Sequence, residues 1–181
     1  MAKQPDTETI EAVEAAATIV PETDEKTVLA AESTIKNYVI GAVSVSIVPI
    51  PLVDVAAVTA LQLRMIQKLS ELYKRPFSEE IVRSLIAALG GSIVGYSAGM
   101  VGMSMVRIVP VFGWMLSLVS IPVMAGASTY AIGKVFVKHY EEGGTILDLN
   151  TEKLKAYYRE QYEKGKAVAK AATGRSASAA A

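Results

Sequence analysis

The chain has 181 residues, of which 51% are hydrophobic, and this length fits one domain with polar tails. Its 18 Lys and Arg balance 18 Asp and Glu, so no overall charge draws it to nucleic acid. It contains no cysteine, which excludes disulfides, thiol nucleophiles and thiolate metal sites.

Residues 1–22 are rich in Ala, Thr and Glu and are expected to form a disordered tail. Early acidic residues such as Asp6 and Glu8 are atypical of a secretory signal. Membrane insertion would therefore use internal segments. We expect residues 23–145 to form a helical membrane domain.

Thr23 or Asp24 is expected to cap the first helix, which becomes apolar from Tyr38. Pro49 and Pro51 then interrupt the apolar run, because proline removes a backbone donor and clashes with the preceding turn. A second helix is predicted from about residue 52 to 73. The sequence thus predicts a hairpin with a proline turn.

The apolar part of this first hairpin, Tyr38–Leu63, has 26 residues. Crossing a bilayer once takes about 20 residues of helix. Folded at its prolines, the run is too short to cross twice. We expect a re-entrant or partly inserted hairpin.

A second hairpin follows, with Ser78 as the expected cap of its first helix. The stretch Ser84–Val106 has no charged residue and would span about 30 Å as a helix, the thickness of a bilayer core. Pro110 and Gly113 mark its turn, and residues 108–133 are again uncharged. This pattern predicts a membrane-spanning hairpin.

Basic residues lie in the linker between the hairpins, for example Lys74 and Arg75, and again after Gly133. The positive-inside rule places this linker and both termini in the cytoplasm of a bacterial inner membrane. The proline turns then point away from the cytoplasm. The alternative is a water-soluble helical bundle that buries its apolar helices by tight self-assembly.

Small residues at a spacing of four follow one stripe of the third helix, and others stand on the fourth. Such stripes let two helix backbones approach closely. They pack either the two arms of the hairpin or a homo-oligomer. The residues are Gly91, Gly95, Gly99 and Gly102, with Ala127 and Ala131 opposite.

Asp54 is the one acidic residue in the first apolar run. It is expected to cap the second helix, to pair with Arg107 beside the other turn, or to line an ion path. The lone His139 is expected to be solvated rather than a metal ligand. The sequence has no P-loop and no serine with a nearby histidine base, so we expect neither enzyme activity nor a cofactor.

Residues 146–172 are expected to form a basic amphipathic helix, followed by a disordered tail, 173–181. The helix would lie on anionic headgroups or a partner. Alternatively, it is a solvated helix stabilised by pairs such as Glu160–Lys164. The residues assigned to the membrane or partner surface are Lys153, Lys155, Tyr158, Arg159, Tyr162 and Lys166.

Residues 48–66 carry a Pro-x-Pro turn, Asp54, an Ala-rich helix and a closing Gln-x-x-Met, and residues 129–134 read TYAIGK. These motifs resemble the YcjF-type family, domain of unknown function 697, over about residues 38–142. The resemblance implies a small helical membrane domain, found alone or fused to an Era-like GTPase. This chain has no GTPase part, so any GTPase would be a separate partner.

The sequence as a whole favours an all-α, non-enzymatic membrane protein that acts as a scaffold or self-assembling component. Its expected partners are membrane lipid, further copies of itself and a separate GTPase. A small channel or transporter component using Asp54 and Arg107 is the first alternative. A soluble self-assembling bundle is the second.

Overall fold

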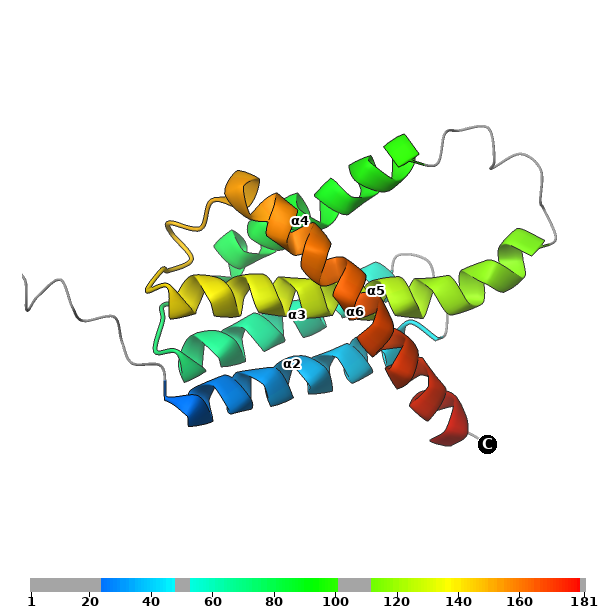
Figure 1. The fold of residues 1–181 in the computed structure, drawn as a ribbon, viewed down its shortest axis with the longest axis horizontal. Helices are drawn as coiled ribbons and strands as arrows, with labels where there is room; N and C mark the ends of the chain where they lie inside the picture. The colour runs from blue at the N-terminus through cyan, green and yellow to red at the C-terminus, as the bar shows by residue number, and fades with distance from the viewer. Residues whose placement is uncertain (1–23, 48–52, 101–111, 180–181) are drawn as a thin grey trace, which may run out of the picture.

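The structure is a computed structural model that describes residues 24–47, 53–100 and 112–179, with the backbone alone for 53–54, 93–100, 112–120 and 175–179. The predicted all-α class is confirmed, because the described residues form helices and no strand. The helices are α2 (Glu25–Val45), α3 (Val53–Leu72), α4 (Glu79–Met100), α5 (Phe112–Glu141) and α6 (Thr151–Ala179) (Figure 1).

Polar residues begin these helices where the sequence predicts them. The Asp24 side chain accepts a hydrogen bond from the Lys26 N–H at 3.4 Å, and α4 starts directly after Ser78. At the start of α6, Asn150 Oδ1 accepts from the Lys153 N–H at 3.3 Å. The Asp24 and Asn150 side chains each satisfy a backbone donor that the first turn of a helix leaves unpaired.

Successive helices run in opposite directions, and α5 lies among α2, α3 and α6 (Figure 1). The main core forms where their apolar faces meet. It includes Ile35 from α2, Met65 and Ile66 from α3, and Ile132 and Phe136 from α5, all with no exposed surface. Burying these large side chains is the main force that holds the bundle together.

Three glycines allow the helices around α5 to come close. A Cβ at Gly165 of α6 would lie 2.9 Å from the Ala127 carbonyl oxygen and 3.0 Å from its Cα. A Cβ at Gly126 would meet Val43 at 2.7 Å, and one at Gly133 would meet Ile35 at 2.7 Å. At Gly165, where the close atoms are backbone, only a residue without a side chain fits, whereas at Gly126 and Gly133 a Cβ would force neighbouring side chains to move.

The last helix is longer than the sequence predicts. We expected it to end at residue 172, but α6 continues to Ala179, so the predicted disordered tail is helical over 173–179. Thr173 Oγ1 donates to the Ala169 carbonyl oxygen at 2.9 Å within the helix.

The arms of the predicted second hairpin correspond to α4 and α5. Among the described residues, no helix is both long and apolar enough to cross a membrane. Pro49, Pro51 and Pro110 of the predicted turns lie outside the described residues. Gly113 lies in the first turn of α5, so this helix starts earlier than the turn prediction allowed.

Candidate functional site

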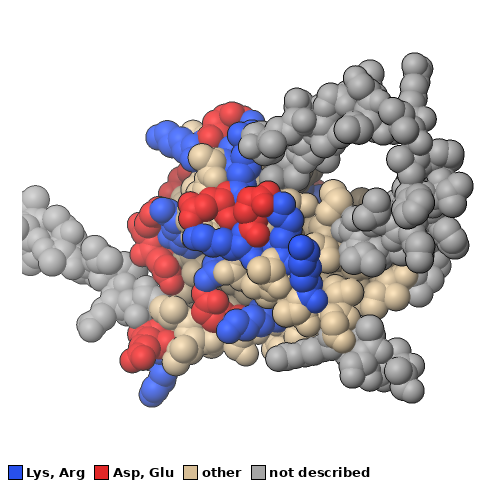
Figure 2. Space-filling model, turned by 45° about the vertical axis from the view of Figure 1, so that its right-hand side comes forward, with Lys and Arg blue, Asp and Glu red and all other residues tan. Residues whose placement is uncertain are grey.

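The bundle has two chemically different ends. At the charged end, α2 begins, the link between α3 and α4 (73–78) turns, and the loop between α5 and α6 (142–150) closes (Figure 1). Figure 2 shows charged side chains over the left and middle of the described surface. The apolar end consists of uncharged segments: residues 37–45 of α2 with the two residues that follow it, 55–63 of α3, 84–100 of α4 and 112–133 of α5.

Hydrogen bonds close the charged end of the bundle. The hydroxyls of Ser70 and Tyr140 lie 2.8 Å apart, and Tyr73 donates to the Glu141 carboxylate at 3.1 Å. Arg75 Nη2 donates to the Tyr140 carbonyl oxygen at 3.5 Å. Burial raises the pKa of Tyr140, while the Ser70 hydrogen bond and the Arg75 charge partly oppose this rise. These contacts fasten the α3–α4 link to the end of α5.

His139 contacts the loop after α5 and is not solvated, which corrects the prediction. Its side chain is 13% exposed, and Nε2 lies 2.8 Å from the Thr145 carbonyl oxygen and 3.2 Å from Asp148 Oδ1. Asp148 Oδ1 also accepts from the Thr145 N–H at 2.6 Å and from its hydroxyl at 2.8 Å. These hydrogen bonds from Thr145 lower the pKa of Asp148 to about 2.

The two sequence motifs meet in the middle of the bundle. Gln62 Nε2 donates to Thr129 Oγ1 at 3.2 Å and to Ser128 Oγ at 3.4 Å. The Ser128 hydroxyl in turn lies 3.1 Å from the Tyr158 hydroxyl of α6. Burial raises the pKa of Tyr158 to about 12, although its bond to Ser128 opposes the rise. The polar members of the two motifs therefore join α3 to α5, and Ser128, which directly precedes the second motif, extends the contact to α6.

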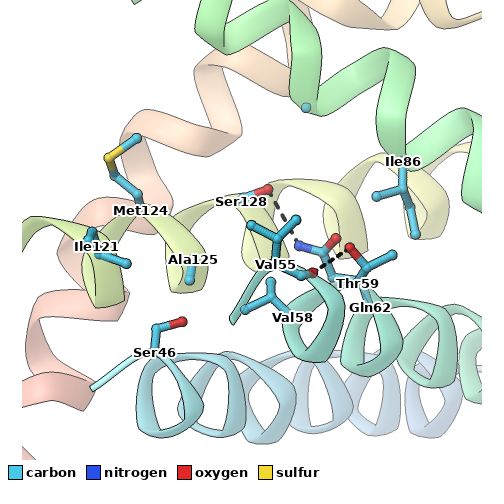
Figure 3. A pocket seen from close by; sticks show the side chains of 11 residues that line it. Ser46, Val55, Val58, Thr59, Gln62, Ile86, Ile121, Met124, Ala125 and Ser128 are labelled. Atoms are coloured by element: carbon cyan, nitrogen blue, oxygen red, sulfur yellow. Dashed lines mark hydrogen bonds between the residues drawn. The ribbon is translucent and has the colours of Figure 1, made fainter. Parts of the chain in front are cut away.

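A pocket of about 330 Å³ opens beside this contact, at the apolar end (Figure 3). Helices α3, α4 and α5 and the residue that follows α2 form its wall. None of the lining residues carries a charge. They are Ser46, Val55, Val58, Thr59, Gln62, Ile86, Gly90, Ile121, Met124, Ala125 and Ser128.

Ser46 is the unusual polar residue of this wall. It is 2% exposed, and its Oγ has no hydrogen-bond partner among the residues that the structure describes. By contrast, Thr59 Oγ1 donates to the Val55 carbonyl oxygen at 2.7 Å. A buried hydroxyl without a partner is unfavourable, which makes this corner of the pocket a candidate for ligand contact.

The predicted match between the two small-residue stripes does not form where the structure describes it. Gly91 is exposed, with no side chain or neighbouring helix within 4 Å of the place a Cβ would take. Gly95 and Gly99 lie on the α4 backbone beyond the described side chains, and Gly102 lies outside the described residues. Ala127 and Ala131 of α5 are buried, and Ala127 receives Gly165 of α6.

Asp54 is the second residue of α3, so it lies inside the first turn, where the helix dipole favours a carboxylate, rather than at the cap position. Its side chain is outside the described part of the chain, as is the whole of Arg107. The proposed pair and the ion path therefore stay predictions.

Two of the residues assigned to the surface of the last helix are core residues instead. Tyr158 has no exposed surface and Tyr162 is 7% exposed, because both pack α6 against the bundle. This corrects the prediction that they contact headgroups. Their spacing of four puts them on one helix face, which is also the pattern of a buried stripe.

The charged residues of α6 form pairs along the helix. Lys164 and Glu160 lie 2.6 Å apart, which confirms the predicted pairing, and Lys166 and Glu163 lie 2.5 Å apart. Lys155 pairs with Glu152. Lys153 is exposed and Arg159 is half-buried, so the basic surface of α6 consists of its lysines without the tyrosines.

Ser46 and Gly165 are the residues that sequence reasoning missed. A single glycine inside a helical pattern is a signal for close packing, and Gly165 carried that signal. Ser46 carried no such signal in the sequence, because a serine next to a proline turn is common.

The fold and pocket define a class: an all-α bundle with one closed, charged end and one uncharged end that contains an open pocket. The chain matches the family described as domain of unknown function (DUF697) over residues 10–167. The protein belongs to this family. A Magnetospirillum gryphiswaldense protein named magnetosome membrane protein 22 is 61% identical to it over 142 residues, covering 78% of this chain and 73% of that protein. No solved structure matches the chain.

Proposed function

We propose that the protein is a non-enzymatic scaffold of a bacterial inner membrane, held there by its apolar end, with its charged end in the cytoplasm. The observation that carries this proposal is the separation of the two ends. Long helix segments without any charge lie at one end of the bundle, and hydrogen bonds between side chains close the other. The name of the similar Magnetospirillum protein places that relative in a membrane.

Exposed apolar side chains support the same orientation. Val45, Ile47, Val55 and Met124 all lie at the apolar end, and between 40% and 70% of each is exposed. Single exposed apolar residues are common on soluble proteins, but a group at one uncharged end indicates contact with lipid or protein.

Helix α6 brings lysines toward this end. It runs away from the charged end (Figure 1), and its Ala169 and Ala172 pack against Val43 and Val123. Lys170 is exposed beside them. Lysines at this level would meet anionic headgroups, each contributing about 1 kcal/mol. We therefore keep the proposal that the lysines of α6 contact anionic headgroups.

Self-assembly is a further part of the proposal. Because Gly91 is exposed, the surface of α4 around it is open to a second copy of the chain. A separate GTPase as partner has its support in the family resemblance alone. Copurification of a GTPase with the full chain in mild detergent would test that part.

Extraction from membranes tests the attachment. Full-length protein should stay with the membrane in carbonate and in high salt. Ile47→Asp combined with Met124→Asp should release it, since a charge moved into the apolar part of a membrane is strongly unfavourable.

Leu29→Asp combined with Leu147→Asp is the matched control, because those leucines are 62% and 75% exposed away from the apolar end. The control protein should remain attached. Release of the wild-type protein by carbonate or salt without detergent would overturn the proposal.

A further inference from the structure

We propose that the pocket at the apolar end binds one acyl chain of a membrane lipid, whose ester carbonyl accepts a hydrogen bond from Ser46 Oγ. This inference rests on the membrane attachment proposed above. It assigns to the pocket a ligand class that the attachment alone does not require.

The lining of the pocket selects the tail of a lipid over its headgroup. No charged residue lines it, so a phosphate or ammonium group inside would lose water without gaining a partner. The polar groups of the wall are engaged within the protein: Gln62 donates to Ser128 and Thr129, and Thr59 donates to its own helix. The rest of the pocket wall is apolar, and an acyl chain matches it.

Ser46 supplies the one polar contact that this wall leaves open. Its hydroxyl is buried, has no partner and is directed into the pocket (Figure 3). A trapped water needs about two to four polar partners, and the other polar side chains here have theirs. A carbonyl oxygen needs one donor, which the Ser46 hydroxyl provides.

The size and mouth of the pocket fit entry from a bilayer. Its volume of about 330 Å³ lies at the lower end of the roughly 300–1,000 Å³ of ligand sites. It is an open cleft rather than a sealed cavity. Val55, 70% exposed, and Met124, 49% exposed, both line the pocket and reach the surface of the apolar end. Among the described residues, a lipid tail can therefore enter past apolar side chains.

Two adjacent glycines of α4 provide a matched pair of variants. Both have open space where a Cβ would stand, but Gly90 lines the pocket and Gly91 is exposed outside it. Gly90→Phe should fill the pocket, while Gly91→Phe adds the same side chain on the same helix and leaves the pocket open.

The test uses vesicles of phosphatidylcholine doped with phosphatidylcholine that carries a diazirine in one acyl chain. After flotation and irradiation, mass spectrometry maps the cross-linked residues. Wild-type protein and Gly91→Phe should float and carry cross-links on pocket residues such as Val58 and Ile86. Gly90→Phe should float equally and lose those cross-links.

The outcomes separate the two proposals. Normal flotation of wild-type protein without pocket cross-links, or with equal cross-links in Gly90→Phe, would overturn the acyl-chain site and leave membrane attachment intact. Failure of the wild-type protein to float would contradict the attachment, and the pocket inference with it.

Ser46→Ala gives a second measurement that does not depend on filling the pocket. The pocket cross-link yield should fall roughly two- to ten-fold, as expected for one net hydrogen bond. Stability without lipid should stay equal or rise, since the variant removes a buried hydroxyl without a partner. Ser44→Ala is the control, because Ser44 Oγ donates to the Ile40 carbonyl oxygen outside the pocket. An unchanged yield in Ser46→Ala would exclude the ester contact.

Discussion

The two ends of this bundle satisfy their polar groups in different ways. At the charged end, Tyr140 bonds Ser70 and Asp148 bonds Thr145, so the loops are closed by the protein itself. At the apolar end, the Ser46 hydroxyl is buried without a partner, and Ile47 and Met124 are exposed. Groups that lack partners within the chain in this way favour contact with a partner outside it, here proposed to be lipid.

Helix α6 connects the two ends, and its contact with α5 is the most sensitive point of that connection. Gly165→Ala places a Cβ 2.9 Å from the Ala127 carbonyl oxygen, where backbone cannot easily move. We expect a loss of about 1–3 kcal/mol in the free energy of unfolding, measured by denaturant titration. Gly91→Ala, in open space, should instead gain about 0.5–1 kcal/mol. Equal effects of the two changes would contradict the close α5–α6 contact.

Between the two ends, Gln62 joins α3 to α5 by hydrogen bonds. Gln62→Leu keeps the approximate size of the side chain but removes the donor to Thr129 and Ser128, so stability should fall by about 1–2 kcal/mol. Thr59→Val serves as the control, since the Thr59 hydroxyl donates within its own helix, and should change stability by less than about 0.5 kcal/mol. Thermal unfolding monitored by circular dichroism measures both.

Removing one hydroxyl tests how far the charged end depends on its own hydrogen bonds. Tyr140→Phe should cost about 1 kcal/mol, because Ser70 loses its buried partner. A double-mutant cycle with Ser70→Ala should show that the two changes are coupled. Strictly additive losses would mean that the 2.8 Å contact contributes nothing.

The smallest expected effect concerns acid. Asp148 has its pKa lowered from 3.8 to about 2 in the folded protein, so its bonds stabilise the loop above pH 3.8. This contribution is lost as the pH falls toward 2. The melting temperature of Asp148→Asn should therefore depend less on pH, between about 4 and 2, than that of the wild-type protein. Parallel curves would show that the carboxylate does not stabilise the loop.

Local patterns in the sequence were sufficient to predict the helices and their beginnings. Asp24 and Ser78 stand before apolar periodic segments, and capping depends on a few neighbouring residues. The uncharged stretches likewise identified the apolar end, because a lack of charge over about 20 residues can be read directly. The predicted pair Glu160–Lys164 formed for the same local reason.

Which faces of those helices meet could not be predicted in this way. The sequence favoured Gly91 opposite Ala127, but Gly165 fills that place, because small residues match many partners and only packing of the whole bundle chooses among them. Tyr158 and Tyr162 appeared on a basic helix and became core residues, since the basic residues occupy the other faces of α6.

The sequence by itself determined an all-α chain of the DUF697 family with a charged and an uncharged part. Only the tertiary structure decided that Gln62 meets Thr129 and that Ser46, left without a partner, lines a pocket beside them. Gln62 and Thr129 are 67 positions apart. Contacts over such separations depend on how several helices pack at once, which local spacing cannot specify.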